Sequence, residues 1–362
     1  MSVQHYNTQV NIFDVFCGRG VYANGGHGSP IQAMEAIKKV RTDHPSETQF
    51  VLYLNDSVKK FVEGVREYIE HNFETDRLCK VQYMNVPAKY LFGKLVDYLE
   101  AQPKRSKNLL FIDPYGYKDI HKDTMQKMLN NRNTEILLFL PISFMHRFTH
   151  YAFDGNANKG ALPLRDFISE FFPEDHIVRQ DEPMDVMQYI SELAKAFSFE
   201  NRFYSTSYFI KRDYKNYFAL FFITPNLLGL ERAVDSMWQL DEEGGQGFRM
   251  LDYSQPRLFE EYFEQERKRE IEENLRTLIL GFLSMGQKTN CELYKLILCR
   301  GYKISQANMV MRLLQNEGLI SVFDIEKQKE ARKNSFYLSY ANAKDTRHPK
   351  AYIKIKKDKI ES

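Results

Sequence analysis

In the first two-thirds of the chain, short runs of apolar residues alternate with segments in which apolar residues recur every three or four positions. Such runs are typical of buried strands and such spacing of amphipathic helices, so the alternation predicts βαβ units and a parallel sheet. In the segment 58–71, for example, Phe61, Val62, Val65 and Ile69 share one helical face. The expected strands cover residues 10–16, 50–54, 80–83, 108–112 and 135–140.

A later pair of apolar runs, 203–212 and 217–224, flanks the polar turn 213–216. This arrangement predicts an antiparallel hairpin that closes the sheet. The expected fold class is therefore α/β, with a sheet of about seven strands.

The pattern changes at the polar, glycine-rich break 241–247, which precedes a densely charged helical segment. Three further helical patterns, 271–284, 290–300 and 305–315, are followed by two short apolar runs, 318–323 and 335–338, which is the order of a winged helix-turn-helix. We expect a first domain over residues 1–245, a charged linking helix over 246–270, a winged helix domain over 271–342 and a basic tail over 343–362.

The composition indicates a folded protein, but its net charge does not indicate a particular partner. The 362 residues include 27% charged and 43% hydrophobic residues, as in a folded chain, and 50 basic against 48 acidic residues give a net charge of only +2. No apolar run approaches the ~20 residues of a membrane helix, and the N-terminus lacks the features of a secretion signal. We therefore expect a cytoplasmic protein without a membrane partner. The four cysteines have no metal-site spacing, so no metal is expected.

The first candidate site follows the first expected strand, where the sequence reads Asp14-x-Phe-x-Gly18-x-Gly20. Glycines are needed where a backbone turns sharply off a strand and approaches a ligand closely. Asp14, Gly18 and Gly20 are therefore candidate cofactor-binding residues, although a simple tight turn would also explain the glycines. Ser29 and Pro30 are expected to cap the helix that follows.

Two further acidic residues follow later strands. Asp56 comes directly after the second strand, where α/β nucleotide sites place a carboxylate for ribose hydroxyls. Asp113, Pro114 and Tyr115 follow the fourth strand and resemble the Asp/Asn-Pro-Pro-Tyr signature of amino-group methyltransferases, with one proline in place of two. The Asp113 carboxylate and the Pro114 carbonyl would accept the amino hydrogens, and Tyr115 would stack on a flipped base. Alternatively, the turn only shapes the cofactor pocket.

Several motifs in order along residues 10–240 resemble the three-Cys-motif partner (TcmP) family. They are Asp14-x-Phe-x-Gly-x-Gly, Gly28-Ser29-Pro30, Phe111-Ile112-Asp113-Pro114-Tyr115-Gly116, Phe222-Ile223-Thr224-Pro225-Asn226, Gly229-Leu230 and Ser236-Met237-Trp238. The resemblance implies a Rossmann-like S-adenosylmethionine methyltransferase fold with a C-terminal winged helix. It also implies S-adenosylmethionine contacts at Asp14, Gly18, Gly20 and Asp56, a reaction side lined by Asp113, Pro114 and Tyr115, and a radical-SAM-like partner that carries the three cysteines.

The C-terminal segment contains candidate residues for contact with nucleic acid. In the third helical pattern, the polar residues Ser305, Gln306, Asn308, Arg312 and Gln315 face outward with Met309. Together with the basic residues of 326–333 and 350–359, they favour contact with nucleic acid, while a protein contact and a solvated wing remain open.

Three functions are compatible with the sequence. The leading hypothesis is an S-adenosylmethionine-dependent methyltransferase that acts on nucleic acid at a base nitrogen. The second is a non-catalytic or regulatory partner of a radical-SAM-like three-Cys-motif protein that keeps the fold. The third is a dinucleotide-dependent Rossmann enzyme, in which Ala23 would stand at the third glycine of the Gly-x-Gly-x-x-Gly pattern.

Overall fold

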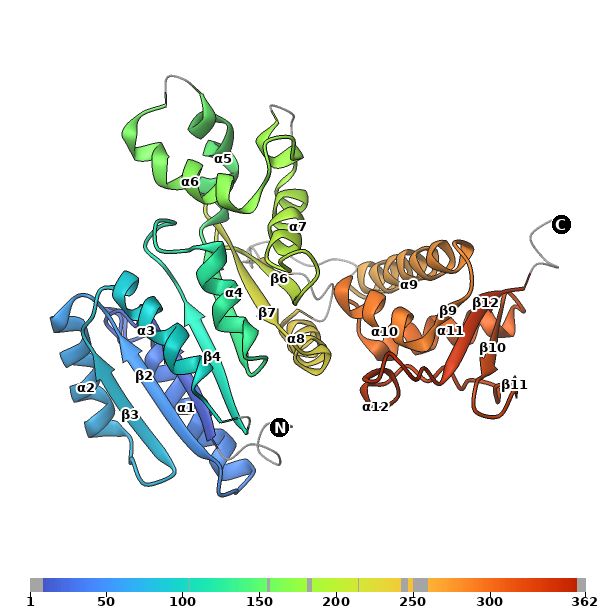
Figure 1. Ribbon diagram of the computed structural model, residues 1–362, viewed down its shortest axis with the longest axis horizontal. Helices are drawn as coiled ribbons and strands as arrows, with labels where there is room; N and C mark the ends of the chain where they lie inside the picture. Colours follow the sequence, from blue (N-terminus) through green and yellow to red (C-terminus); the bar gives the residue numbers. More distant parts are fainter. Residues whose placement is uncertain are drawn as a thin grey trace. The chain divides into compact units, whose positions relative to one another are not determined.

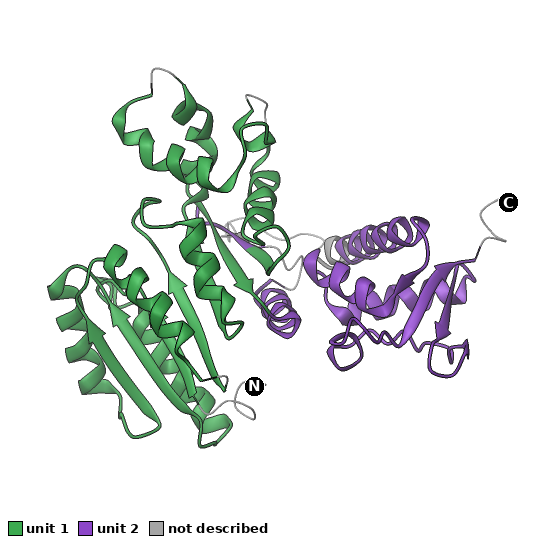
Figure 2. Ribbon diagram, viewed as in Figure 1, with its two compact units in different colours: residues 1–207, 215–225 green, residues 208–214, 226–362 purple. Residues whose placement is uncertain are grey.

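The computed structural model describes residues 9–103, 105–154, 157–180, 184–213, 215–241, 247–249 and 260–356. The chain forms two compact units (Figure 2). One comprises residues 1–207 and 215–225, and the other comprises residues 208–214 and 226–362. None of the described helices is both long and apolar enough to span a membrane.

The main sheet has the strand order β3-β2-β1-β4-β5-β7-β6-β8 (Figure 1). Neighbouring strands from β3 to β5 in this order pair in parallel, whereas β5 and β7 pair antiparallel. The order of β1 to β7 is that of Rossmann-like methyltransferases, so the expected fold class is confirmed. The strands are β1 (Gln9–Asp14), β2 (Gln49–Asn55), β3 (Cys79–Met84), β4 (Ser106–Ile112), β5 (Thr134–Leu140), β6 (Tyr204–Lys211), β7 (Tyr217–Thr224) and the short additional strand β8 (Gly247–Arg249).

Among the described residues of the first unit, seven α-helices connect the strands. The strand order reverses at β1, and because parallel crossovers are right-handed, the helices before and after the reversal cover opposite faces of the sheet. Accordingly, α1 packs with α2 and α3 packs with α4. The helices are α1 (Ser29–Asp43), α2 (Lys59–Asn72), α3 (Ala88–Glu100), α4 (Lys122–Asn130), α5 (Ile142–Phe153), α6 (Leu162–Phe171) and α7 (Val186–Ala196).

The apolar positions of these elements form the core as the sequence pattern predicts. On α2, Val62, Val65 and Ile69 are buried, which confirms the expected helical face. In β4, alternate residues are buried, with Leu110 and Ile112 at the centre of the sheet. After β5 the helices α5, α6 and α7 form a group of their own (Figure 1).

The second unit contains α8 and a group of helices with a four-stranded sheet of order β11-β10-β12-β9. Its helices are α8 (Leu227–Leu240), α9 (Glu260–Ser284), α10 (Asn290–Cys299), α11 (Ile304–Asn316) and α12 (Tyr340–Ala343). Its strands are β9 (Lys288–Thr289), β10 (Ile320–Asp324), β11 (Lys329–Glu330) and β12 (Ala351–Ile355).

Four features of this unit differ from the sequence-based expectation. Residues 260–270 of the expected linking helix and the first helix of the winged helix domain are one continuous helix, α9, and α8 belongs to the second compact unit. The segment 335–338 is not a strand, because β10 pairs with β11 on one side and with β12 on the other. Residues 351–355 of the expected tail are therefore part of the sheet, while 250–259 and 357–362 lie outside the described residues.

A buried asparagine explains how the expected tail joins the fold. Asn290 is fully buried at the start of α10. Its Nδ2 donates to the carbonyl oxygens of Tyr337 and Asn342, both at 3.1 Å, and its Oδ1 accepts from the backbone N–H groups of Lys350 at 2.9 Å and Ala351 at 3.2 Å. One side chain thus makes hydrogen bonds with four backbone groups in and around α12. The sequence pattern does not predict this role.

We expect Asn290→Ala to destabilise the second unit by about 2–4 kcal/mol, because it leaves buried backbone donors and acceptors without partners. The single tryptophan, Trp238, lies in this unit and donates from Nε1 to the Gly301 carbonyl, so its fluorescence reports unfolding there. Urea unfolding followed by this signal measures the change. The exposed Asn316, replaced by alanine, is the matched control and should change stability by less than about 0.5 kcal/mol. Equal effects of the two substitutions would contradict the role of Asn290.

Candidate functional site

The predicted acidic residues meet at the carboxyl edge of the sheet. Asp14 is the last residue of β1, Asp56 follows the end of β2, and Asp113 follows the end of β4. In the parallel register, Asp14 pairs with Leu54 on one side and Phe111 on the other, so all three carboxylates belong to the same edge. β1 is also where the strand order reverses, which is the position where open α/β sheets bind ligands.

The loop after β1 has the backbone that the glycines predict. Gly18 and Gly20 have φ values of +58° and +73°, and residues other than glycine rarely adopt this backbone conformation. A Cβ at Gly20 would lie 2.7 Å from Cγ2 of Val65 on α2, so packing also requires glycine there. Around a Cβ at Gly18, none of the described residues would lie within 4 Å. The outer side of Gly18 is therefore open to a ligand, whereas Gly20 is required by the fold.

Asp56 anchors this loop to the sheet. Its Oδ2 accepts from the Gly18 N–H at 3.1 Å, and its Oδ1 accepts from the Val58 N–H at 2.8 Å. The side chain is buried. A second link joins the Cys17 N–H to the carbonyl oxygen of Asn55 at 2.8 Å. In this arrangement both Asp56 oxygens already accept a backbone hydrogen bond, so Asp56 shapes the glycine loop, and its contact with a ribose stays a prediction.

Asp14 is the buried centre of the site. Its Oδ2 accepts from the Ser29 hydroxyl at 2.6 Å, while its buried Oδ1 has no hydrogen-bond partner among the described residues. Burial, with added repulsion from the Asp113 and Asp56 carboxylates, raises the pKa of Asp14 to about 7, although the Ser29 hydrogen bond opposes this shift. Asp14 therefore titrates near neutral pH.

Ser29 has a different role from the one that the sequence predicts. The N-cap residue of α1 is Gly28, and the Ser29 hydroxyl points to Asp14 instead of to the helix backbone. The loop closes onto this helix through a hydrogen bond of 2.6 Å from the Gly28 N–H to the Gly20 carbonyl oxygen. Ser29 is thus a site residue that the sequence analysis missed, since a serine before a helix is ordinarily a cap.

Asp113, Pro114 and Tyr115 form the outer part of the site. Asp113 is exposed on one side, but the protein around its carboxylate raises its pKa to about 6 through desolvation. Pro114 is buried, and the Tyr115 ring is 80% exposed. The Tyr115 ring meets Phe16 edge to face at 6.4 Å between centroids. An exposed ring held beside a carboxylate can stack on a planar group whose polar edge that carboxylate binds.

Two other kinds of chemistry would be relevant at this edge, a reactive thiolate and a metal ion. Cys17 is buried beside the carboxylates, and burial together with the Asp14 and Asp56 charges raises the pKa of its thiol, so the thiolate nucleophile is disfavoured. Within the part of the chain that the structure describes, no group of three His, Cys, Asp or Glu side chains could hold a metal ion.

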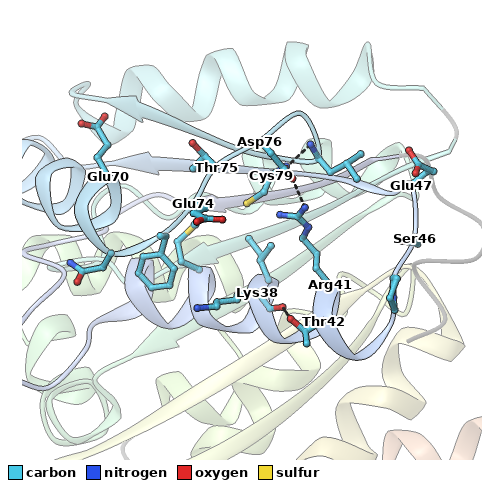
Figure 3. Close-up of a pocket in the computed structure, with 16 residues that line it drawn as sticks. Lys38, Arg41, Thr42, Ser46, Glu47, Glu70, Glu74, Thr75, Asp76 and Cys79 are labelled. Carbon is cyan, nitrogen blue, oxygen red and sulfur yellow. Dashed lines mark hydrogen bonds and ion pairs between the residues drawn. The ribbon is translucent and has the colours of Figure 1, made fainter.

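A separate hollow of about 1280 Å³ lies between the end of α1, the end of α2 and the start of β3 (Figure 3). Arg41 points toward Asp76 there and pairs with its Oδ2 at 2.6 Å. This hollow is at the amino edge of the sheet, opposite the carboxylates, and its charged residues Arg41 and Asp76 pair with each other. It contains none of the residues that the sequence predicts for a site.

Comparisons with known proteins find only remote structural similarity. No family model and no curated protein matches the sequence. Among solved structures, the chain is similar to Trm1 from Pyrococcus horikoshii in complex with S-adenosyl-L-methionine (13% identity, 59% of this chain and 49% of that chain, TM-score 0.30). It is also similar to magnesium protoporphyrin IX methyltransferase (ChlM) from Synechocystis PCC 6803 with bound SAH (9% identity, 59% and 73%, TM-score 0.27). A third is the mycolic acid cyclopropane synthase CmaA1 complexed with SAH and CTAB (12% identity, 74% and 73%, TM-score 0.28).

The chain spans about half the length of the Trm1 chain. TM-scores of 0.30 and below carry no argument about what this chain binds. The fold assignment therefore depends on the strand order and pairing of the sheet.

The raised pKa of Asp14 predicts a pH-dependent stability. The folded state holds a proton up to about pH 7 that the unfolded state, with a pKa of 3.8, releases earlier. This contribution to stability is full below the unfolded pKa and is lost as the pH rises through 7. Between pH 5 and pH 8 the wild type should lose on the order of 2 kcal/mol relative to Asp14→Asn, which cannot titrate.

Differential scanning calorimetry at several pH values measures this difference, which corresponds to several degrees in Tm. The exposed Asp97 on α3, replaced by asparagine, is the control and should follow the wild type. Parallel pH profiles for the wild type and Asp14→Asn would show that Asp14 does not titrate in this range.

Proposed function

We propose that this chain is an S-adenosylmethionine-dependent methyltransferase that acts on nucleic acid, at a base nitrogen. The observation that carries the proposal is the convergence of Asp14, Asp113 and the open Gly18 loop at the carboxyl edge of β1 and β4, with the exposed Tyr115 ring beside them. The motifs shared with the three-Cys-motif partner family lie at the same positions and support this reading.

The residues present fit a cationic cofactor. Burial is the main cause of the raised pKa of Asp14, repulsion by the Asp113 and Asp56 carboxylates adds to it, and a positive ligand would offset both. The Asp14 carboxylate would pair with an ammonium group, and Gly18 leaves room for close approach of a ligand to the backbone. S-adenosylmethionine carries a sulfonium and an ammonium group, and when bound it supplies an activated methyl group. Asp14, Gly18, Gly20 and Asp56 would hold it.

Asp113 and Tyr115 would position the acceptor. At neutral pH Asp113 is largely ionised, since its pKa is about 6, and its carboxylate can accept a hydrogen bond from an exocyclic amino group. The Pro114 carbonyl would accept the second amino hydrogen, and Tyr115 would stack on the base. When the nitrogen gains the methyl group it must lose one proton, and Asp113 can accept that proton and pass it to solvent. Alignment is the main contribution of these residues.

The second unit supports a nucleic-acid substrate through its exposed basic residues. On α11, Ser305, Met309 and Arg312 are exposed, whereas Gln306, Asn308 and Gln315 make internal hydrogen bonds. The exposed part of α11 is thus narrower than the sequence predicts. Lys329, Arg332 and Lys333 are exposed after β10, and such cations favour phosphates. We interpret α9 to α11 with β10 to β12 as a winged helix module that holds the nucleic acid.

The second candidate partner, a radical-SAM-like three-Cys-motif protein, stays a prediction from the family resemblance. A folded chain that does not bind the cofactor would favour that docking role over catalysis.

Cofactor binding is tested by calorimetric titration with S-adenosylmethionine and S-adenosylhomocysteine. We expect micromolar affinity, lost in Asp14→Ala and in Gly18→Val, because the first removes a negative partner and the second places a branched side chain at a positive φ on the open side of the loop. Asp97→Ala is the control and should bind as the wild type does. Melting curves establish that each variant is folded. Absence of binding by the folded wild type would overturn the methyltransferase proposal.

The role of Asp113 is tested by transfer of a labelled methyl group to pooled RNA and DNA. Asp113→Ala should retain S-adenosylmethionine binding and lose turnover by about a hundredfold or more. Asp113→Asn keeps an acceptor oxygen without the charge and should retain more activity than the alanine variant. If Asp113→Ala instead abolishes cofactor binding, Asp113 belongs to the cofactor pocket wall and not to the reaction side.

A further inference from the structure

Helix α5 has an outer face that is unusual for a helix on a protein surface. Its inner face consists of buried residues, namely Ile142, Met145, Thr149 and Ala152. The outer face consists of Phe144, Arg147, Phe148 and Tyr151, which follow the i, i+3, i+4, i+7 spacing of one helical stripe. We call these four residues the α5 aromatic face. An ordinary exposed stripe would be polar, so three aromatic rings on one stripe make it a candidate binding surface.

The rings of this face form a continuous series of contacts. Phe144 and Phe148 lie 4.7 Å apart between centroids, and Phe148 and Tyr151 lie 6.5 Å apart. Phe144 is 47% exposed and Tyr151 is 39% exposed. The hydroxyl oxygen of Tyr151 accepts from the Asn158 N–H at 3.2 Å, which fixes the far end of the series. The rings are therefore held in place while their surfaces remain accessible.

The series leads back to the candidate site. Phe144 stacks on Tyr117 at 6.4 Å, with an interplanar angle of 22°. Tyr117 is buried, and its hydroxyl donates to the Pro141 carbonyl oxygen, which precedes α5. Only Gly116 separates Tyr117 from Tyr115 in the sequence. The α5 aromatic face thus begins beside the turn that carries Asp113 and Tyr115, and both belong to the first compact unit.

The charge on α5 selects the kind of molecule that this face can bind. The helix contains Arg147, His146 and His150 and no acidic residue. The Arg147 guanidinium lies 5.9 Å from the centroid of the Phe148 ring and is exposed. His146 faces inward, where its Nε2 lies 2.7 Å from the Met184 carbonyl oxygen. Flat rings beside a guanidinium, without a carboxylate on the helix, match nucleobases joined by an anionic backbone.

We propose that the α5 aromatic face is a stacking surface for an unpaired stretch of the nucleic-acid substrate next to the base that enters the site. This proposal rests on the proposed function, because it names the form in which the substrate reaches Asp113 and Tyr115. Stacking on aromatic side chains is tolerant of sequence, since every base has a flat face. The surface therefore selects for single-stranded character and not for a particular base.

The test uses the full chain and labelled single-stranded RNA and DNA of about 12 nucleotides, within the usual site size for such binding. Fluorescence anisotropy should show that Phe144→Ala and Tyr151→Ala each weaken binding by about tenfold, whereas Phe144→Tyr and Tyr151→Phe, which keep the rings, bind as the wild type does. Tyr90→Ala is the matched control, because Tyr90 is an exposed ring on α3 and should have no effect.

Two further measurements separate stacking from a general loss of structure. Arg147→Gln should reduce the slope of log affinity against log salt concentration by about 0.7, the value for one phosphate contact on a single strand. The exposed Arg77, replaced by glutamine, is its control. Oligonucleotides that contain 5-iodouracil should crosslink to a peptide that contains residues 144–151, as located by mass spectrometry.

The results distinguish this proposal from the proposed function. Unchanged affinity in both alanine variants, with crosslinks elsewhere, would overturn the α5 surface even if methyl transfer occurs. Loss of binding in the alanine variants without any S-adenosylmethionine binding would retain the surface and overturn the methyltransferase assignment. Binding of the wild type to anionic vesicles of phosphatidylserine and phosphatidylcholine, but to neither oligonucleotide, would overturn the surface in favour of a membrane contact.

Discussion

The candidate site depends on one constraint, the parallel register that ends β2, β1 and β4 at a common edge. This register places three carboxylates at one edge of the sheet, and burial, with added repulsion from Asp113 and Asp56, raises the pKa of Asp14 to about 7. An arrangement that concentrates like charges costs stability in the absence of a positive partner. Proteins retain such costs mainly at functional sites, where a ligand or a reaction uses them.

The fold was predictable because its signals are local and repeated. Apolar runs alternate with amphipathic segments through the first unit, and their order gives the sheet its strands and its hairpin. The position of Asp14, Asp56 and Asp113 at the carboxyl ends of strands was predictable for the same reason, since each lies at the end of an apolar run. Ser29 was misassigned as a helix cap, because only the folded loop shows that its hydroxyl faces Asp14.

The second unit shows where sequence patterns lose information. Its sheet depends on β12, a strand of five residues. The charged residues around this strand led to the prediction of a basic tail there. What recruits this strand is a set of hydrogen bonds from Asn290, about sixty residues earlier in the chain. A buried amide that satisfies four backbone groups leaves no periodic signal, because its effect depends on contacts distant in sequence and not on its neighbours.

The glycine loop has a further consequence for how the sequence can change. Gly20 is confined by Val65 on α2, at a distance that leaves no room for a methyl group. Positions 20 and 65 are therefore coupled: a larger residue at position 65 would push the loop outward, and a smaller one would leave a void beneath it. The helix that covers the sheet thus acts as a template for the loop beside the site. In this chain, a change at either position would have to be matched at the other to keep the loop in place.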